Sequence, residues 1–127
     1  MKKNFKIKII GESPSNLFLA LILLKSGFKV EIYKNNQITK KIREKKLFLI
    51  SNTTKSLLVD FNLWPFLKDK SYSIESICIN DMSIYKKVNF SFLNFKSNKI
   101  NTNNIAWILN YSDIFECLLS EIAKFKN

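Results

Sequence analysis

The feature that most constrains the fold is the order strand, glycine, helix, glycine, strand at the start of the chain. Phe5–Ile10 is short and rich in isoleucine, which is typical of a β-strand, and Gly11 follows it directly. Ser13 and Pro14 then predict the start of a helix, since serine is a good N-cap and proline is favoured at the first helical position. Gly27 is placed to end that helix.

The helix predicted over Pro14–Leu24 is apolar on nearly every side, as expected for a helix packed inside a domain. A second strand is predicted directly after it, over Phe28–Tyr33. Strand, helix and strand together have the length that a parallel βαβ crossover needs. The predicted fold class is therefore α/β, with a Rossmann-like βαβ unit over residues 1–34.

The turn between the first strand and the helix is where Rossmann-like units bind a dinucleotide pyrophosphate, at the positive end of the helix. The usual pattern there is G-x-G-x-x-G. In this chain only the first glycine is present, because Ser13 and Asn16 occupy the other two glycine positions, and Glu12 adds a negative charge. The candidate cofactor-contacting residues of the turn are Gly11, Ser13, Pro14, Ser15 and Asn16.

An acidic residue that binds the nucleotide ribose is expected at the end of the second strand. Lys34 occupies that place, whereas Glu31 lies inside the strand and is interpreted as an exposed strand residue. A lysine there suits a 2′-phosphate, so an NADP-type nucleotide-binding module is an alternative. Lys34 is retained as a candidate cofactor contact.

The rest of the chain is predicted to contain both strands and helices. An extended segment at Leu47–Ile50 precedes a helix over Ser51–Phe61, which Asn62–Pro65 closes. A strand-rich segment covers about residues 70–110, and the last helix covers about 112–125, with Asp113 as its N-cap. The predicted strands of that segment are Ile74–Ile79, Tyr85–Phe95 and Ile105–Leu109.

The composition excludes several classes of site. The chain has no histidine, which removes Ser-His and Cys-His nucleophile pairs and histidine metal ligands, and its two cysteines have no metal-ligand spacing. The net charge of +11 comes almost entirely from scattered lysines. That footprint is too diffuse to indicate a nucleic-acid partner, so a basic binding module is kept only as a further alternative. The apolar run Leu17–Leu24 is too short to span a membrane.

Four stretches, in order, resemble the flavin-dependent aromatic hydroxylases with the para-hydroxybenzoate hydroxylase fold, and in particular their ubiquinone-biosynthesis branch. Ile9–Pro14 is similar to the strand that ends in Gly-x-Gly-Pro in that family. Lys46–Ser51 followed by Asn62–Pro65 is similar to Arg-Ala-Leu-Ala-Leu-Ser followed by Gly-Leu-Trp. Two further similar stretches are Ile74–Asp81 and Ile105–Leu109.

The resemblance implies FAD as cofactor, NAD(P)H as electron donor and a polyprenyl phenol as substrate, with the flavin performing the oxygen transfer. It places Lys46 where the family has an arginine near the flavin nucleotide, so Lys46 is a further candidate cofactor contact. No side chain is assigned a catalytic role. The expected location is cytoplasmic, with at most peripheral contact with a membrane.

The family's later segments have no counterpart here, so we expect an incomplete FAD-binding domain over residues 1–127. One edge of the Ile7–Ile10 strand should then lack a neighbour, and exposed edges pair readily with other chains. Two hypotheses remain open. The chain is the FAD-binding portion of a monooxygenase, acting alone or completed by a second chain, or it is a non-catalytic scaffold or partner subunit derived from that portion.

Overall fold

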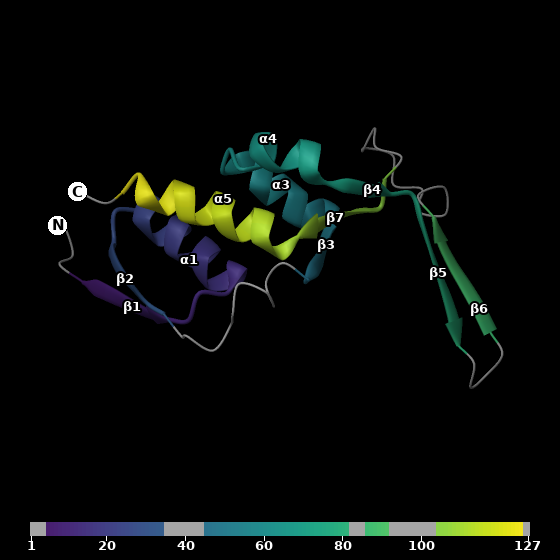
Figure 1. The fold of residues 1–127 in the computed structure, drawn as a ribbon, viewed down its shortest axis with the longest axis horizontal. Coiled ribbons are helices and arrows are strands. Elements are labelled where there is room, and N and C mark those ends of the chain that lie inside the picture. Colours follow the sequence, from purple (N-terminus) through teal and green to yellow (C-terminus); the bar gives the residue numbers. More distant parts are fainter. Residues whose placement is uncertain (1–4, 35–44, 82–85, 92–103, 126–127) are drawn as a thin grey trace. The chain divides into compact units, whose positions relative to one another are not determined.

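The computed structural model describes residues 5–34, 45–81, 86–91 and 104–125 (Figure 1). It has the mixed α/β fold predicted from the sequence. The chain forms two compact units, one of Met1–Leu47 with Asn110–Asn127 and the other of Phe48–Leu109. No helix of the described residues is long and apolar enough to cross a membrane.

The first unit contains the predicted βαβ crossover. β1 (Lys6–Ile10) and β2 (Lys29–Tyr33) are parallel, with Lys6 beside Lys29 and Ile10 beside Tyr33, and α1 (Pro14–Lys25) connects them. The helix ends at the predicted glycine, because Gly27 has a φ of 84°, a left-handed conformation that glycine adopts without steric cost. The local signals of the sequence are thus confirmed.

A second helix, α5 (Tyr111–Ala123), packs alongside α1 in the same unit, and both lie on one side of the strand pair (Figure 1). Its predicted N-cap was wrong: Asn110 is the N-cap, and Asp113 lies in the first turn. The helix starts earlier because β7 leads directly into it, with the Tyr111 amide donating to the Lys46 carbonyl. Both helices bury apolar side chains, among them Leu17, Ala20, Leu21, Ile114, Leu118 and Ile122.

The β1–β2 sheet has one covered and one open face. Ile9 is buried on the helix side, whereas Lys6, Lys8 and Ile10 are exposed on the other. Within the described residues the sheet has only these two strands. Parallel sheets are usually covered on both faces, and their strands are then apolar throughout. The charges on β1 therefore fit a sheet with one face in water.

The second unit is built on a three-stranded sheet with the order β3–β7–β4. β4 and β7 are antiparallel, with Ser73 beside Trp107. A separate antiparallel pair, β5 and β6, joins Ser76 to Ser91 and Asp81 to Lys86. The elements of this unit are β3 (Leu47–Ser51), α3 (Asn52–Asp60), α4 (Trp64–Leu67), a 3-10 turn (Lys68–Lys70), β4 (Tyr72–Ile74), β5 (Ser76–Asp81), β6 (Lys86–Ser91) and β7 (Ala106–Asn110).

Three predictions for this unit need correction or completion. The single strand predicted over Ile74–Ile79 is two strands, because the chain changes pairing partner, from β7 to β6, around Glu75. The helix predicted over Ser51–Phe61 ends at Asp60, before the predicted closing segment Asn62–Pro65, and the structure adds a further helix, α4, that begins at Trp64. The strand predicted over Tyr85–Phe95 is observed as β6 over Lys86–Ser91, and residues 85 and 92–95 of the prediction lie outside the described residues.

Candidate functional site

The turn between β1 and α1 is fixed by the backbone of Gly11. Its φ is 99°, in the left-handed region that favours glycine. The Gly11 amide donates a hydrogen bond of 2.8 Å to the carbonyl of Tyr33, the last residue of β2. This bond fastens the turn to the end of the neighbouring strand, so the strand–turn–helix geometry of a dinucleotide-binding unit is present in the backbone.

Ser13 acts as the N-cap of α1, as predicted. Its Oγ accepts a hydrogen bond of 3.2 Å from the Asn16 amide, and its carbonyl accepts one of 2.9 Å from the Leu17 amide. Pro14, at the first helical position, has no amide hydrogen. The serine hydroxyl and the Asn16 amide, two groups that a bound phosphate would use at a helix N-terminus, are therefore already paired with each other.

Asn16 fills the space beside the turn. Its Nδ2 donates to the Ile10 carbonyl at 3.1 Å and to the Gly11 carbonyl at 3.4 Å. A Cβ built on Gly11 would lie 3.2 Å from this same nitrogen, so the amide group closes directly over the glycine. Where the fingerprint has its third glycine, this chain has a side chain that binds back to the end of β1.

Glu12 and Lys34 form an ion pair between the start of α1 and the end of β2. The Nζ of Lys34 lies 3.3 Å from Oε1 of Glu12. The lysine side chain is 72% exposed but the glutamate side chain only 12%, so the carboxylate is the buried partner. The signs are opposite to those of the fingerprint, which has an acid at the end of the second strand.

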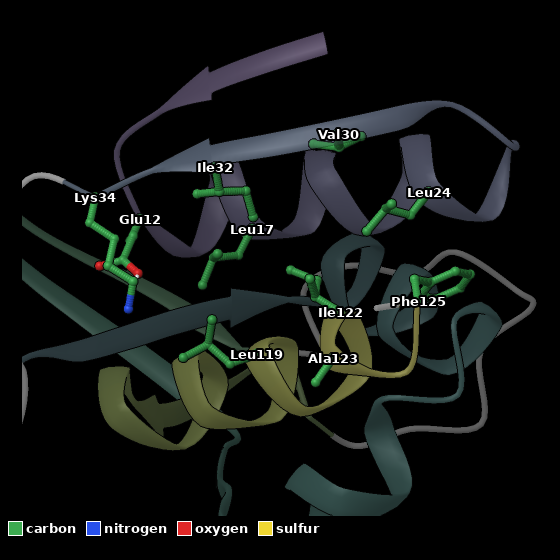
Figure 2. Close-up of a pocket in the computed structure, with 10 residues that line it drawn as sticks. All are labelled: Glu12, Leu17, Leu24, Val30, Ile32, Lys34, Leu119, Ile122, Ala123 and Phe125. Carbon is green, nitrogen blue, oxygen red and sulfur yellow. Dashed lines mark ion pairs between the residues drawn. The ribbon is translucent and has the colours of Figure 1, made fainter. Parts of the chain in front are cut away.

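A cavity of about 230 Å³ opens beside this ion pair, entirely within the first unit. Figure 2 shows Glu12 and Lys34 at one end of it and Leu24 and Phe125 at the other. Side chains of β2 and α5, including Ile32 and Leu119, line the middle. The cavity is therefore apolar along most of its length, with the charges gathered at one end.

Lys46 is held at the start of α5. Its carbonyl accepts a hydrogen bond of 2.8 Å from the Tyr111 amide, and its Nζ lies 5.9 Å from the centroid of the Tyr111 ring. Such a placement is within the range of a cation–π interaction. Among the interactions of the described residues, none joins Lys46 to the Gly11–Asn16 turn.

The open face of the sheet carries a second charged cluster, which the sequence reasoning did not identify. Glu31 accepts from the Lys6 ammonium and, at 3.1 Å, from the Tyr33 hydroxyl, while Lys8 lies 5.6 Å from the Tyr33 ring centroid. The hydrogen bond from Lys6 holds the pKa of Glu31 below its ordinary value and raises the pKa of Lys6. Parallel register, which puts Lys8 beside Glu31, was the signal that could have revealed it.

Sequence and structure comparisons differ in outcome. No family model and no curated protein matches the chain. Several solved structures, in contrast, match the chain. They include 2-methyl-3-hydroxypyridine-5-carboxylic acid oxygenase, with a TM-score of 0.66 and 13% identity over 97% of this chain. p-Nitrophenol 4-monooxygenase PnpA from Pseudomonas putida gives a TM-score of 0.68 with 13% identity over 94% of this chain.

HpxO from Klebsiella pneumoniae, solved with FAD and uric acid, gives a TM-score of 0.62 with 12% identity over 94% of this chain. The fold of this chain matches that of a segment of each of these structures. The chain spans only about 30% of the length of these structures, two of which are named as an oxygenase and a monooxygenase. At such low identity the similarity shows the fold alone.

Proposed function

We propose that this chain is a non-catalytic partner subunit, derived from the FAD-binding part of a flavin-dependent aromatic monooxygenase, that provides the fold of that part without holding the flavin itself. The fold comparison supports the origin, since nearly the whole chain aligns with such enzymes. The proposed loss of FAD binding rests on the turn after β1, where the side-chain amide of Asn16 lies over Gly11.

The residues of the turn do not fit a pyrophosphate lying against the backbone. A phosphate there would have to displace the Asn16 side chain, which makes two hydrogen bonds, and to compete for the amide that Ser13 already caps. Each net hydrogen bond is worth about 1 kcal/mol, so opening the turn costs roughly 2 kcal/mol, or more than tenfold in affinity.

The second candidate is the FAD-binding portion of a monooxygenase that retains its cofactor and is completed by another chain. The left-handed Gly11 and the intact helix start favour it, and the order of the resembling stretches favours a polyprenyl phenol as the substrate of the complete enzyme. NAD(P)H would then be the electron donor, and contact with the membrane would be peripheral. Ser15, Lys34 and Lys46 stay candidate cofactor contacts under this proposal.

Isothermal titration of the purified chain with FAD and with ADP separates the two candidates. We expect no binding with a Kd below about 1 mM for the natural chain. The double substitution Ser13→Gly, Asn16→Gly restores the fingerprint glycines and should bring measurable ADP binding, whereas Ser15→Gly, in the same turn, should not. Yellow protein carrying FAD in its natural sequence would contradict the proposal and support the second candidate.

The control for folding is the thermal transition of each variant. Glycine at the N-cap costs only a few tenths of a kcal/mol, and Asn16→Gly costs about 1–2 kcal/mol through its lost side-chain bonds. A folded double variant that still ignores ADP would show that the closed turn is not what excludes the nucleotide.

A further inference from the structure

We propose that the groove beside β2 binds an extended segment of a partner polypeptide, which adds to the sheet as a strand with apolar residues at alternate positions and acidic residues between them. This inference rests on the proposed function as a partner subunit and names the surface and the chemistry of the partner. It starts from the sheet, which has only β1 and β2 within the described residues.

Among the residues that the structure describes, no further strand pairs with the outer edge of β1 or of β2. Such edges are templates for pairing with another chain. An added strand would satisfy the outer N–H and C=O groups of β2. This mode of recognition is common, with the backbone giving affinity and the pockets for alternate side chains giving specificity.

The edge of β2 differs from that of β1 because an apolar groove lies beside it. Val30 and Ile32 of β2 are only half-buried, and they line the cavity together with Leu119, Ile122 and Ala123 of α5 (Figure 2). A strand added to β2 would direct every second side chain into this groove. An apolar cavity of about 150 Å³ holds a benzene-sized group, so the observed 230 Å³ has room for roughly one or two apolar side chains.

The charge of the open face of the sheet determines which residue types suit the partner positions that point away from the groove. Side chains that do not enter the groove would lie on the open face, beside Lys29 and Glu31 of β2. The exposed charges of that face are Lys6, Lys8 and Lys29 against Glu31 alone, and Glu31 is already paired with Lys6. Three lysines and one lysine-paired glutamate leave this face with a net positive charge, so acidic residues of the partner complement it electrostatically.

The test uses the full chain and a fluorescein-labelled heptapeptide that alternates glutamate and valine, with binding followed by fluorescence anisotropy. Ala123→Glu places a charge in the groove at an exposed helix position, and we expect it to weaken binding at least about tenfold. Ser120→Glu is the matched control, since it is exposed on the same helix, carries the same charge change and does not line the groove. It should change binding by less than about twofold.

Two further probes identify strand addition. A peptide methylated on alternate backbone nitrogens cannot complete the hydrogen-bond ladder and should not bind, and bound peptide should slow hydrogen exchange over residues 28–34. Absence of peptide binding, equal binding to Ala123→Glu, or protection confined to other segments would overturn the inference. Its failure is distinguishable from that of the proposed function, because FAD binding by the same preparation decides the latter whatever the peptide does.

Discussion

Lys55 provides the sharpest test of how the second unit is stabilised. Its Nζ lies 4.0 Å from the ring centroid of Trp107 and 5.1 Å from that of Trp64. The two indoles meet edge to face, with centroids 5.7 Å apart and an interplanar angle of 76°. Both tryptophans are buried, Trp107 at 5% exposure and Trp64 at 9%, so the ammonium group lies against the core of this unit.

Replacing Lys55 by methionine should destabilise this unit by about 1–2 kcal/mol. Cation–π contacts are worth about 0.5–1 kcal/mol at exposed sites and about 2 kcal/mol when desolvated, and Lys55 is half-buried over two rings. Methionine keeps an apolar stem and a similar helix propensity, so the charge is the main change. Arginine keeps the charge and should preserve most of the stability.

The measurement is urea unfolding followed by tryptophan fluorescence. The chain has only two tryptophans, and both lie in this cluster, so the signal reports this unit. With a denaturant slope of about 1–2 kcal/mol/M, the midpoint of Lys55→Met should fall by about 1 M. Lys68→Met removes an exposed lysine of the same unit as a control. An unchanged midpoint for Lys55→Met, or an equal loss for Lys55→Arg, would refute the reasoning.

Three further predictions concern the first unit. Lys34→Met should lower the free energy of unfolding by about 1–3 kcal/mol, because it leaves the Glu12 carboxylate, which is only 12% exposed, without its lysine. Glu12→Gln should lower it less, and thermal unfolding of the two variants checks this order. The lowered pKa of Glu31 means that its contribution to stability is present above the ordinary value of 4.5 and is lost as the pH falls, so urea midpoints of the natural chain and Glu31→Gln should converge between pH 7 and pH 3. Gly27→Ala should cost about 1 kcal/mol for its left-handed backbone alone, and Gly11→Ala more, because the new Cβ also meets an amide nitrogen at 3.2 Å; equal melting temperatures would contradict this order.

Three local features of the first unit were predictable from the sequence. The cap formed by Ser13, the proline at the first helical position and the left-handed Gly27 all act within a few residues of the chain, so their signals survive without any tertiary information. The parallel β1–β2 pair followed from the length of the crossover between two short apolar strands. The boundaries of α1 agree with the prediction to within one residue at its end.

The start of α5 was predicted wrongly because a local signal competed with a distant one. Asp113 and Glu116 have the spacing of a capping box, but the hydrogen bond between Tyr111 and Lys46 joins residues far apart in sequence and starts the helix earlier. Asn62 shows a smaller departure from the resembling family pattern. It adopts a φ of 59° where the resembling pattern has glycine, and asparagine is one of the few other residues that tolerate this conformation.

The sequence by itself determined that the chain opens with a βαβ unit and that two of the three fingerprint glycines are replaced. It did not determine what the replacements do. Only the tertiary structure shows Asn16 closing over Gly11 and Glu12 reaching Lys34 from the other end of the crossover. The physical reason is that helix and strand periodicity are properties of neighbouring residues, whereas the contents of a turn depend on side chains that the fold brings together from separate elements.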